Sequence, residues 1–186
     1  MIYTATANTN LVVTLAELKE HMRLESSYTA EDTLITSYLK AATVHAEKYC
    51  NRFFLETTIS SFYDDFPSDQ FELKKGEVTE VTAITYKDTD SASQTWSSTK
   101  YDTDLHSVPA RIQPTITESF PDSDGSMNNV TVQYKVGWAS ASDVPEDIKT
   151  AIKLIAARLY LVREDTVFKL ATAAEHYLNP FRLNYL

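Results

Sequence analysis

The pattern of apolar and polar positions is clearest in residues 129–165, where a period of two changes to a helical period. Before Gly137, apolar residues alternate with polar ones, which is typical of a strand with one buried face; they are Val130, Val132, Tyr134 and Val136. After it, apolar residues recur at steps of three and one, which predicts a helix over about 145–163; they are Ile148, Ala151, Ile152, Ile155, Ala156, Leu159 and Tyr160. We expect Asp143 to cap this helix and Pro145 to occupy its first turn, where a missing donor costs nothing.

Two further helices are predicted near the N-terminus. Thr14 and Glu17 have the spacing of a capping box, which predicts a helix over about 15–24. Thr29 is the predicted cap of a second helix over about 31–50, because apolar residues recur there at helical spacing. The chain therefore opens with two amphipathic helices.

Between the second and third helices lies a β segment, at about residues 53–138. Asn51 is expected to end the second helix, and short runs rich in Thr, Ile, Phe, Tyr and Val then alternate with polar turns. After the third helix comes a tail, at about 166–186, in which Pro180 breaks any helix.

This order of elements predicts the fold class α+β. We expect a three-helix bundle, made of two N-terminal helices plus one long C-terminal helix, with a small antiparallel β sheet or sandwich inserted between the second and third helices. A length of 186 residues predicts a single domain over residues 1–186.

Charge narrows the classes of function. With 26 acidic and 17 basic residues, the formal net charge is −9, which argues against a protein that binds DNA by neutralising phosphates. The N-terminal residues have neither a basic region nor an apolar core, and no apolar run is long enough to span a bilayer, so neither export by a signal peptide nor a membrane span is expected. The single cysteine, Cys50, cannot form an internal disulfide.

Few residues suggest catalysis. With three glycines, the chain has no glycine-rich phosphate loop, and no serine or cysteine lies in a nucleophile motif. Asp102, Asp104 and His106 alternate along a predicted strand and would suit a divalent cation in a small metal-dependent enzyme, although such alternation is more typical of a solvated strand face. We therefore predict no catalytic residue, no cofactor and no metal, and no enzymatic activity.

Four stretches, taken in order, resemble one protein family. LAELKEHMRLE contains Leu15, Lys19, Met22 and Arg23 in a Leu-x-x-x-Lys-x-x-Leu-Arg pattern, with Met22 in place of leucine. The second helix carries Asp32, Ile35, Ala41, Ala42, Glu47, Tyr49 and Arg52 at the expected spacings, and VPEDIKTAIKLIAARLYLVRED and LNPFR follow. Together they resemble the head-tail connector, or adaptor, proteins of tailed bacteriophages, in particular the longer members of the group similar to the HK97 connector. The resemblance is weakest over residues 57–113.

The resemblance implies a virion structural protein of the neck. Members form a ring, usually a dodecamer, that docks under the portal vertex, extends the DNA channel and provides the attachment site for the next tail-side component. An alternative within the phage neck is a stopper or tail-completion protein.

The implied partners follow from that role. They are the portal protein, a stopper or tail-side neck protein, further copies of the same chain, and genome DNA that passes through the lumen without specific binding. The implied locations are the virion neck and, during assembly, the host cytoplasm. Since the C-terminal segment of the family reaches the portal, the expected portal-binding residues are Tyr177, Leu178, Pro180, Phe181 and Arg182.

Overall fold

The computed structural model describes residues 2–6, 9–163 and 172–184, and these divide into two compact units. The helical unit comprises residues 9–55, 138–163 and 172–184, and the sheet unit comprises residues 2–6 and 56–137. The sheet unit thus interrupts the helical unit in the sequence. That residues 1–186 act as one domain stays a prediction.

The helical unit contains four α-helices and a short 3-10 helix among the described residues. They are α1 (Leu15–His21), α2 (Asp32–Cys50), α3 (Glu146–Leu161), α4 (Thr172–Leu178) and η1 (Asn179–Phe181). The predicted capping box is confirmed: the Glu17 amide donates to Thr14 Oγ1 over 3.2 Å, and the Thr14 amide donates to Glu17 Oε2 over 2.6 Å. Asn51 ends α2 in the left-handed conformation with φ 54°, which asparagine tolerates better than most residues.

The other two predicted caps are wrong. Helix α2 begins with Glu31 at its cap position and α3 with Pro145, and neither makes a side-chain capping hydrogen bond. The Asp143 carboxylate instead accepts hydrogen bonds from the amide and hydroxyl of Ser140, at 3.1 and 2.8 Å. A short polar residue just before a helix can bond either to the preceding turn or to the helix N-terminus, and Asp143 bonds to the turn.

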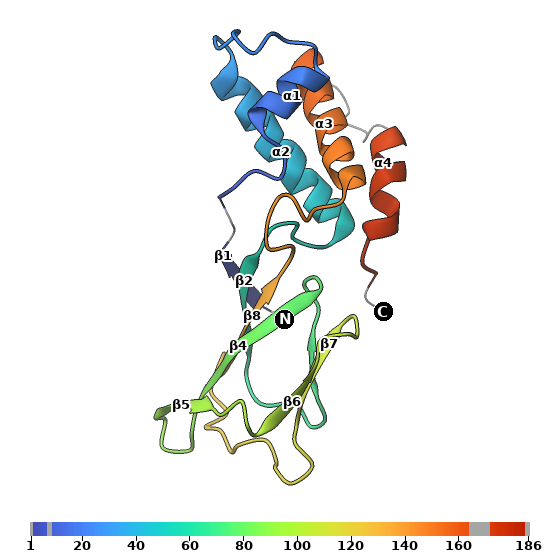
Figure 1. The fold of residues 1–186 in the computed structure, drawn as a ribbon. Helices are drawn as coiled ribbons and strands as arrows, with labels where there is room; N and C mark the ends of the chain where they lie inside the picture. The colour runs from blue at the N-terminus through green and yellow to red at the C-terminus, as the bar shows by residue number, and fades with distance from the viewer. Residues whose placement is uncertain (1, 7–8, 164–171, 185–186) are drawn as a thin grey trace. The chain divides into compact units, whose positions relative to one another are not determined.

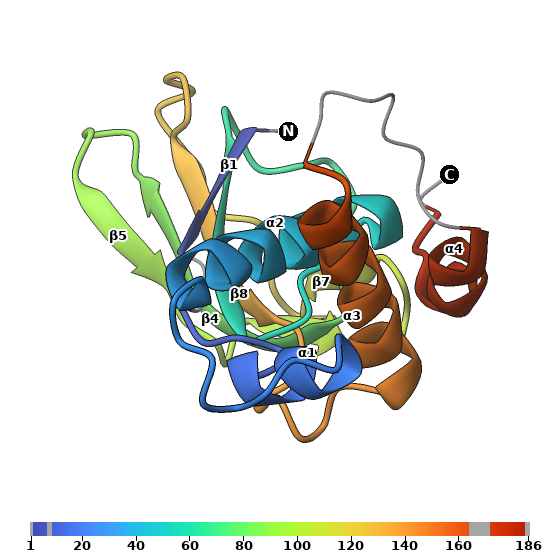
Figure 2. The same ribbon diagram turned by 90° about the horizontal axis from the view of Figure 1, so that it is seen from above.

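The core of the helical unit consists of apolar stripes on its helices. Helix α2 buries Ile35, Leu39, Ala42, Ala46 and Cys50, and α3 buries Ile148, Ala151, Ile152, Ile155 and Ala156. The alanines let the two helix backbones approach closely, while leucine and isoleucine fill the remaining space. Figure 2 shows α3 between α2 and α4, and α4 completes the core with Ala174 and Leu178, both buried.

The sheet unit contains eight strands in two antiparallel sheets (Figure 1). The five-stranded sheet has the order β1 (Ile2–Thr6), β2 (Thr57–Tyr63), β8 (Val130–Val136), β4 (Val78–Lys87), β5 (Ser93–Trp96). The three-stranded sheet has the order β3 (Phe71–Leu73), β7 (Ala110–Pro114), β6 (Tyr101–Asp104). The predicted alternation in β8 is confirmed, because every second residue from Val130 to Val136 is buried.

Aromatic side chains from both sheets and two loops form a cluster in the sheet unit. The Phe66 ring lies 5.9 Å from Phe71 of β3, 5.7 Å from Trp96 of β5 and 5.4 Å from Phe120, measured between ring centroids. Such tilted and edge-on pairs contribute stabilisation beyond their buried area. They hold the loops that carry Phe66 and Phe120 against the sheets.

The predicted three-helix bundle with one long C-terminal helix and a small inserted sheet is wrong. The described residues form four α-helices and eight strands in two sheets, with about equal helix and strand content. The third helix ends at Leu161, and a further helix, α4, follows because Ala174 and Leu178, four residues apart, bury one face. The strands also begin outside the predicted segment, because β1 at the N-terminus pairs with β2. Residues 166–171 and 185–186 of the predicted tail lie outside the described residues.

Candidate functional site

The C-terminal segment, defined here as residues 172–184, packs on the C-terminal end of α2. Leu178 is fully buried in the helical core. The Leu183 amide donates to the Cys50 carbonyl over 2.9 Å, and the Cys50 thiol donates to the Leu178 carbonyl over 3.7 Å. Burial raises the pKa of that thiol to about 11, so Cys50 stays protonated and unreactive at neutral pH.

Polar contacts of Tyr49 and Asn51 fix the same segment. The Tyr49 hydroxyl donates to Asn179 Oδ1 over 2.6 Å, and the Arg182 guanidinium lies 5.4 Å from the centre of the Tyr49 ring. The Asn51 side-chain amide donates to the Leu183 carbonyl over 3.4 Å. The LNPFR stretch is therefore attached to its own chain at several points.

The five residues predicted to bind the portal differ in their accessibility. Leu178 is buried, and Phe181 is half-buried against the helical core. Tyr177 is 37% exposed, and Pro180 and Arg182 are exposed as well. The geometry thus gives Leu178 a place in the core and leaves three of the five at the surface. Portal binding by this set stays a prediction.

A second polar cluster ties the end of α3 to the start of α2. Glu31 accepts hydrogen bonds from the Tyr160 hydroxyl at 2.6 Å and from Arg163 Nη2 at 2.9 and 3.1 Å. The Arg163 guanidinium also lies 4.7 Å from the centre of the Tyr160 ring. The Tyr160 hydroxyl, and then Arg163, hold the pKa of the Glu31 carboxyl below its usual value. These contacts fix the C-terminal end of α3 relative to the start of α2.

Two further residues of the sequence resemblance make contacts inside the helical unit. Lys19, only 5% exposed, lies 2.5 Å from an oxygen of Asp32 and donates to the Tyr28 carbonyl over 2.7 Å. The Arg52 guanidinium lies 4.5 Å from the centre of the Trp138 ring. Sequence reasoning found Lys19 and Arg52 but missed Trp138 as a partner. Nothing in the local pattern links residues so far apart in the chain.

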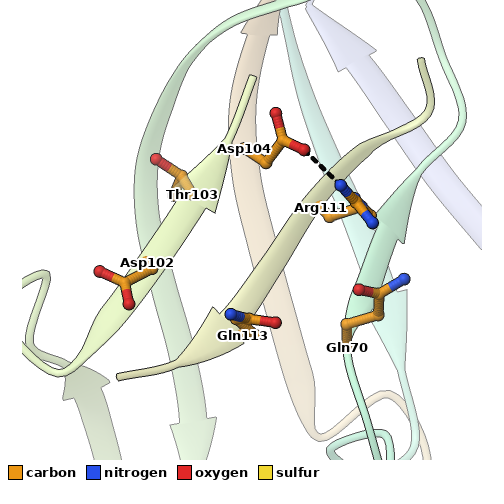
Figure 3. Close-up of a pocket in the computed structure, with 6 residues that line it drawn as sticks. All are labelled: Gln70, Asp102, Thr103, Asp104, Arg111 and Gln113. Carbon is orange, nitrogen blue, oxygen red and sulfur yellow. Dashed lines mark hydrogen bonds and ion pairs between the residues drawn. The ribbon is translucent and has the colours of Figure 1, made fainter. Parts of the chain in front are cut away.

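Asp102 and Asp104 do share one face of the three-stranded sheet (Figure 3). That face forms a shallow polar pocket lined by Gln70, Asp102, Thr103, Asp104, Arg111 and Gln113. Asp104 Oδ2 accepts from Arg111 Nη2 at 2.6 Å and from the Ser107 hydroxyl at 2.6 Å. The Ser107 hydroxyl, and then Arg111, hold the pKa of the Asp104 carboxyl well below its usual range.

This arrangement does not favour the metal-site alternative. Arg111 already neutralises Asp104, and His106 contacts Asp104 through its backbone amide, 3.1 Å from Oδ1. Within the described ranges, no three histidine, cysteine, aspartate or glutamate side chains could jointly hold a metal ion. The pocket therefore has the character of a solvated sheet face crossed by an ion pair.

The sequence profile described as "Phage gp6-like head-tail connector protein" matches residues 12–119, more than half of the chain. The chain belongs to the phage gp6-like head-tail connector family. It is accordingly a head-tail connector. The matched range spans α1 and α2 and extends through β7, including residues 57–113, where the motifs of the sequence resemblance are weakest.

The connector also resembles solved structures over its whole length. A chain of the "Neck of empty GTA particle computed with C6 symmetry" superposes with a TM-score of 0.82 at 21% identity. Chains of the "Virion of native gene transfer agent (GTA) particle" and the "Neck of native GTA particle computed with C12 symmetry" give TM-scores of 0.79 at 21% and 19% identity. Each match covers 100% of the connector and 97% of the other chain. At 19–21% identity, this similarity shows a shared fold.

No curated protein matches the connector in sequence. Within the described ranges, no helix is long and apolar enough to cross a membrane.

Proposed function

We propose that the connector forms a ring that docks under the portal vertex, extends the DNA channel and provides the attachment site for the next tail-side component. Both units would act in this role as one connector domain. The observation that carries the proposal is the family match over residues 12–119. The whole-chain fold likeness to neck proteins supports it. The role is structural, and no enzymatic step is part of it.

The number of subunits in the proposed ring is twelve. The support is the C12 symmetry with which one of the similar necks was computed, together with the C6 symmetry of another, since six is a divisor of twelve. Subunits would meet in the host cytoplasm during assembly and remain in the virion neck. Closed cyclic symmetry requires two different, complementary surfaces on each subunit.

Charge supports passage of DNA through the ring without binding. The described residues of the sheet unit include fourteen acidic and six basic residues, whereas those of the helical unit include ten of each. The net negative charge of the connector therefore resides in the sheet unit. A ring of such subunits repels the phosphate backbone on average, so that DNA does not adhere to it.

The proposed portal contact is the exposed part of the C-terminal segment, carried by Tyr177, Pro180 and Arg182. A tyrosine and an arginine beside a rigid proline turn are residue types enriched in interfaces. The contacts of Tyr49 with Asn179 and Arg182 hold this turn in place before binding, which reduces the entropy lost on association.

The proposal is tested by mixing purified connector with purified cognate portal and imaging the mixture by electron microscopy. We expect a closed ring with an axial channel on one face of the portal. Portal particles that carry no additional ring at saturating connector would contradict the proposal. The connector alone serves as a control, because ring formation should depend on the portal surface.

A further inference from the structure

One end of the sheet unit has an open hollow that none of the functions above uses. It lies where β1 begins and β2 ends, and its lining includes Ile2, Phe62, Pro67, Asp64, Asp65 and Asn128. Ile2, Phe62 and Pro67 contribute apolar surface, while Asp64 and Asp65 contribute two carboxylates. Apolar surface beside carboxylates is the combination that binds a long basic side chain, because its stem is apolar and its end is charged.

The two carboxylates are fixed but retain binding capacity. Asp64 Oδ1 accepts from the Asn128 amide at 2.8 Å. Asp65 Oδ1 accepts from the Ser123 hydroxyl and the Phe66 amide, both at 2.7 Å. Among the described residues, neither Asp64 Oδ2 nor Asp65 Oδ2 has a hydrogen-bond partner. Each side chain thus uses one oxygen to hold its own position and leaves the other for a partner.

The loop beside the hollow is held in place by other residues. The buried Asn129 side chain accepts from the Lys87 amide at 2.5 Å and donates to Asp124 Oδ1 over 2.7 Å. Phe120 of the same loop packs on Trp96 at 5.4 Å between ring centroids. Despite this anchoring, Met127 is 86% exposed. A large apolar side chain on a fixed loop is already organised for contact with a partner.

The charge around the hollow indicates the kind of partner. The loops at this end of the sheet unit, residues 64–69, 88–92 and 115–129, contain eight acidic residues and no lysine or arginine. DNA would be repelled there, and so would the acidic sheet unit of a second copy. A protein surface that presents arginine or lysine beside an apolar patch is complementary both to the negative charge and to the apolar lining of the hollow.

We infer that the hollow formed by Ile2, Phe62, Pro67, Asp64 and Asp65 is a docking site for a basic side chain of the tail-side neck protein. Its aliphatic stem lies on the apolar lining, and its charged end meets the free oxygens of the two aspartates. Ile2, which is 66% exposed, adds apolar contact from the lining, and exposed Met127 precedes the lining residue Asn128 in the sequence. The choice of a neck protein as partner rests on the proposed function, which assigns the portal to the C-terminal segment.

The inference is tested with heads that carry the connector but no tail, mixed with purified tails that bear the tail-side neck protein. The variant is the double substitution Asp64→Asn and Asp65→Asn, which removes two charges but keeps the Oδ1 acceptors that hold the loops. The matched control is Glu20→Gln with Asp102→Asn, an equal change of charge at exposed residues outside the hollow and outside these three loops. Tail joining is followed by infectivity and by electron microscopy at several salt concentrations.

We expect heads with the D64N/D65N connector to join tails about tenfold more slowly at low salt, with a weaker dependence on salt, because a rim charge acts mainly on the association rate. The control should join tails like the wild type. Unchanged joining by D64N/D65N heads would overturn the inference. Loss of the variant connector from heads would also overturn it, because the hollow would then face the portal or a second copy. Failure of wild-type connector to bind heads would instead reject the proposed function.

Discussion

At the scale of single residues, polar positions on which the sequence resemblance rests make contacts within the chain. Lys19 binds Asp32, Arg52 lies over Trp138, and Tyr160 donates to Glu31. Each of these contacts joins two segments of the helical unit that are separate in the sequence. The sequence pattern that indicates the family is therefore largely a pattern of folding contacts, and it does not by itself mark the surfaces that bind partners.

The Lys19 ion pair provides a test of this view. Replacing Lys19 by alanine leaves the Tyr28 carbonyl and one oxygen of Asp32 without their partner in a largely buried position. We expect a loss of about 2 kcal/mol in the free energy of unfolding, below the range for fully buried pairs because Asp32 is partly hydrated. Urea denaturation measures it. Lys40→Ala, at an exposed position of α2, should change stability by less than about 0.5 kcal/mol. Equal effects of the two substitutions would contradict the prediction.

Glu47 predicts a pH dependence of stability. Burial raises the pKa of this carboxyl, although the Phe54 amide, which donates to Glu47 Oε1 over 2.9 Å, partly opposes the shift. The folded state therefore holds the proton to higher pH than the unfolded state, whose pKa lies near 4.5. Stability from this group is complete below that value and falls as pH rises through the folded pKa.

Glu47→Gln should remove this dependence, since glutamine still accepts the Phe54 hydrogen bond but does not ionise. We expect the variant to be more stable than the wild type at pH 7 and equal to it at acid pH, as measured by thermal unfolding across pH. A variant that is less stable at pH 7 would show that the charged form of Glu47 is favoured in the folded connector.

At the scale of elements, the C-terminal segment combines a folding role with the proposed binding role. Leu178 and Ala174 fill the helical core, while Tyr177, between them in sequence, is partly exposed. Neighbouring residues of one short helix thus belong to different functions because they lie on different faces. Stability and portal binding should separate when the two faces are altered one at a time.

We expect Leu178→Ala to lower the free energy of unfolding by about 3 kcal/mol, as for other buried leucines. Tyr177→Ala should change it by less than about 0.5 kcal/mol. Portal binding, measured by cosedimentation, should be weakened by Tyr177→Ala. If Tyr177→Ala binds the portal like the wild type, that residue is not part of the contact.

The elements also differ in how well they can be predicted from the sequence. The capping box of α1, the end of α2 at Asn51 and the alternation in β8 depend on neighbouring residues, and all three were predictable. Strand β1 was not, because its residues are exposed and its pairing with β2 joins residues more than fifty positions apart. Which strands form which of the two sheets was not predictable, for the same reason. The hollow at Asp64 and Asp65 depends on two strands, β1 and β2, and on two loops far apart in the sequence, so it has no local sequence signal.

At the scale of the whole molecule, charge is the property that bears most directly on assembly. The net charge of −9 is concentrated in the sheet unit, so copies of the connector repel one another in solution. Ring closure then requires either a portal surface that fixes the subunits or enough salt to screen the repulsion.

We expect isolated connector to be monomeric at about 50 mM NaCl and to show a larger oligomeric fraction at about 1 M, where the Debye length is about 3 Å. Sedimentation velocity at fixed protein concentration measures this change. Oligomers that dissociate as salt is added would mean that attraction between opposite charges, and not apolar contact, holds the subunits together.

In the sequence, most of the sheet unit is inserted between the two halves of the helical unit, and this sets the order in which the elements are synthesised on the ribosome. Helix α2 leaves the ribosome with its apolar stripe, but the helix that covers this stripe, α3, is made about a hundred residues later. Strand β1 is made before α2, and the other seven described strands, β2 to β8, are synthesised in the interval. The nascent connector can therefore complete its sheets while Ile35 and Leu39 still lack their partners on α3. Chaperones that bind exposed apolar helices would act in that interval, before the chain can join any ring.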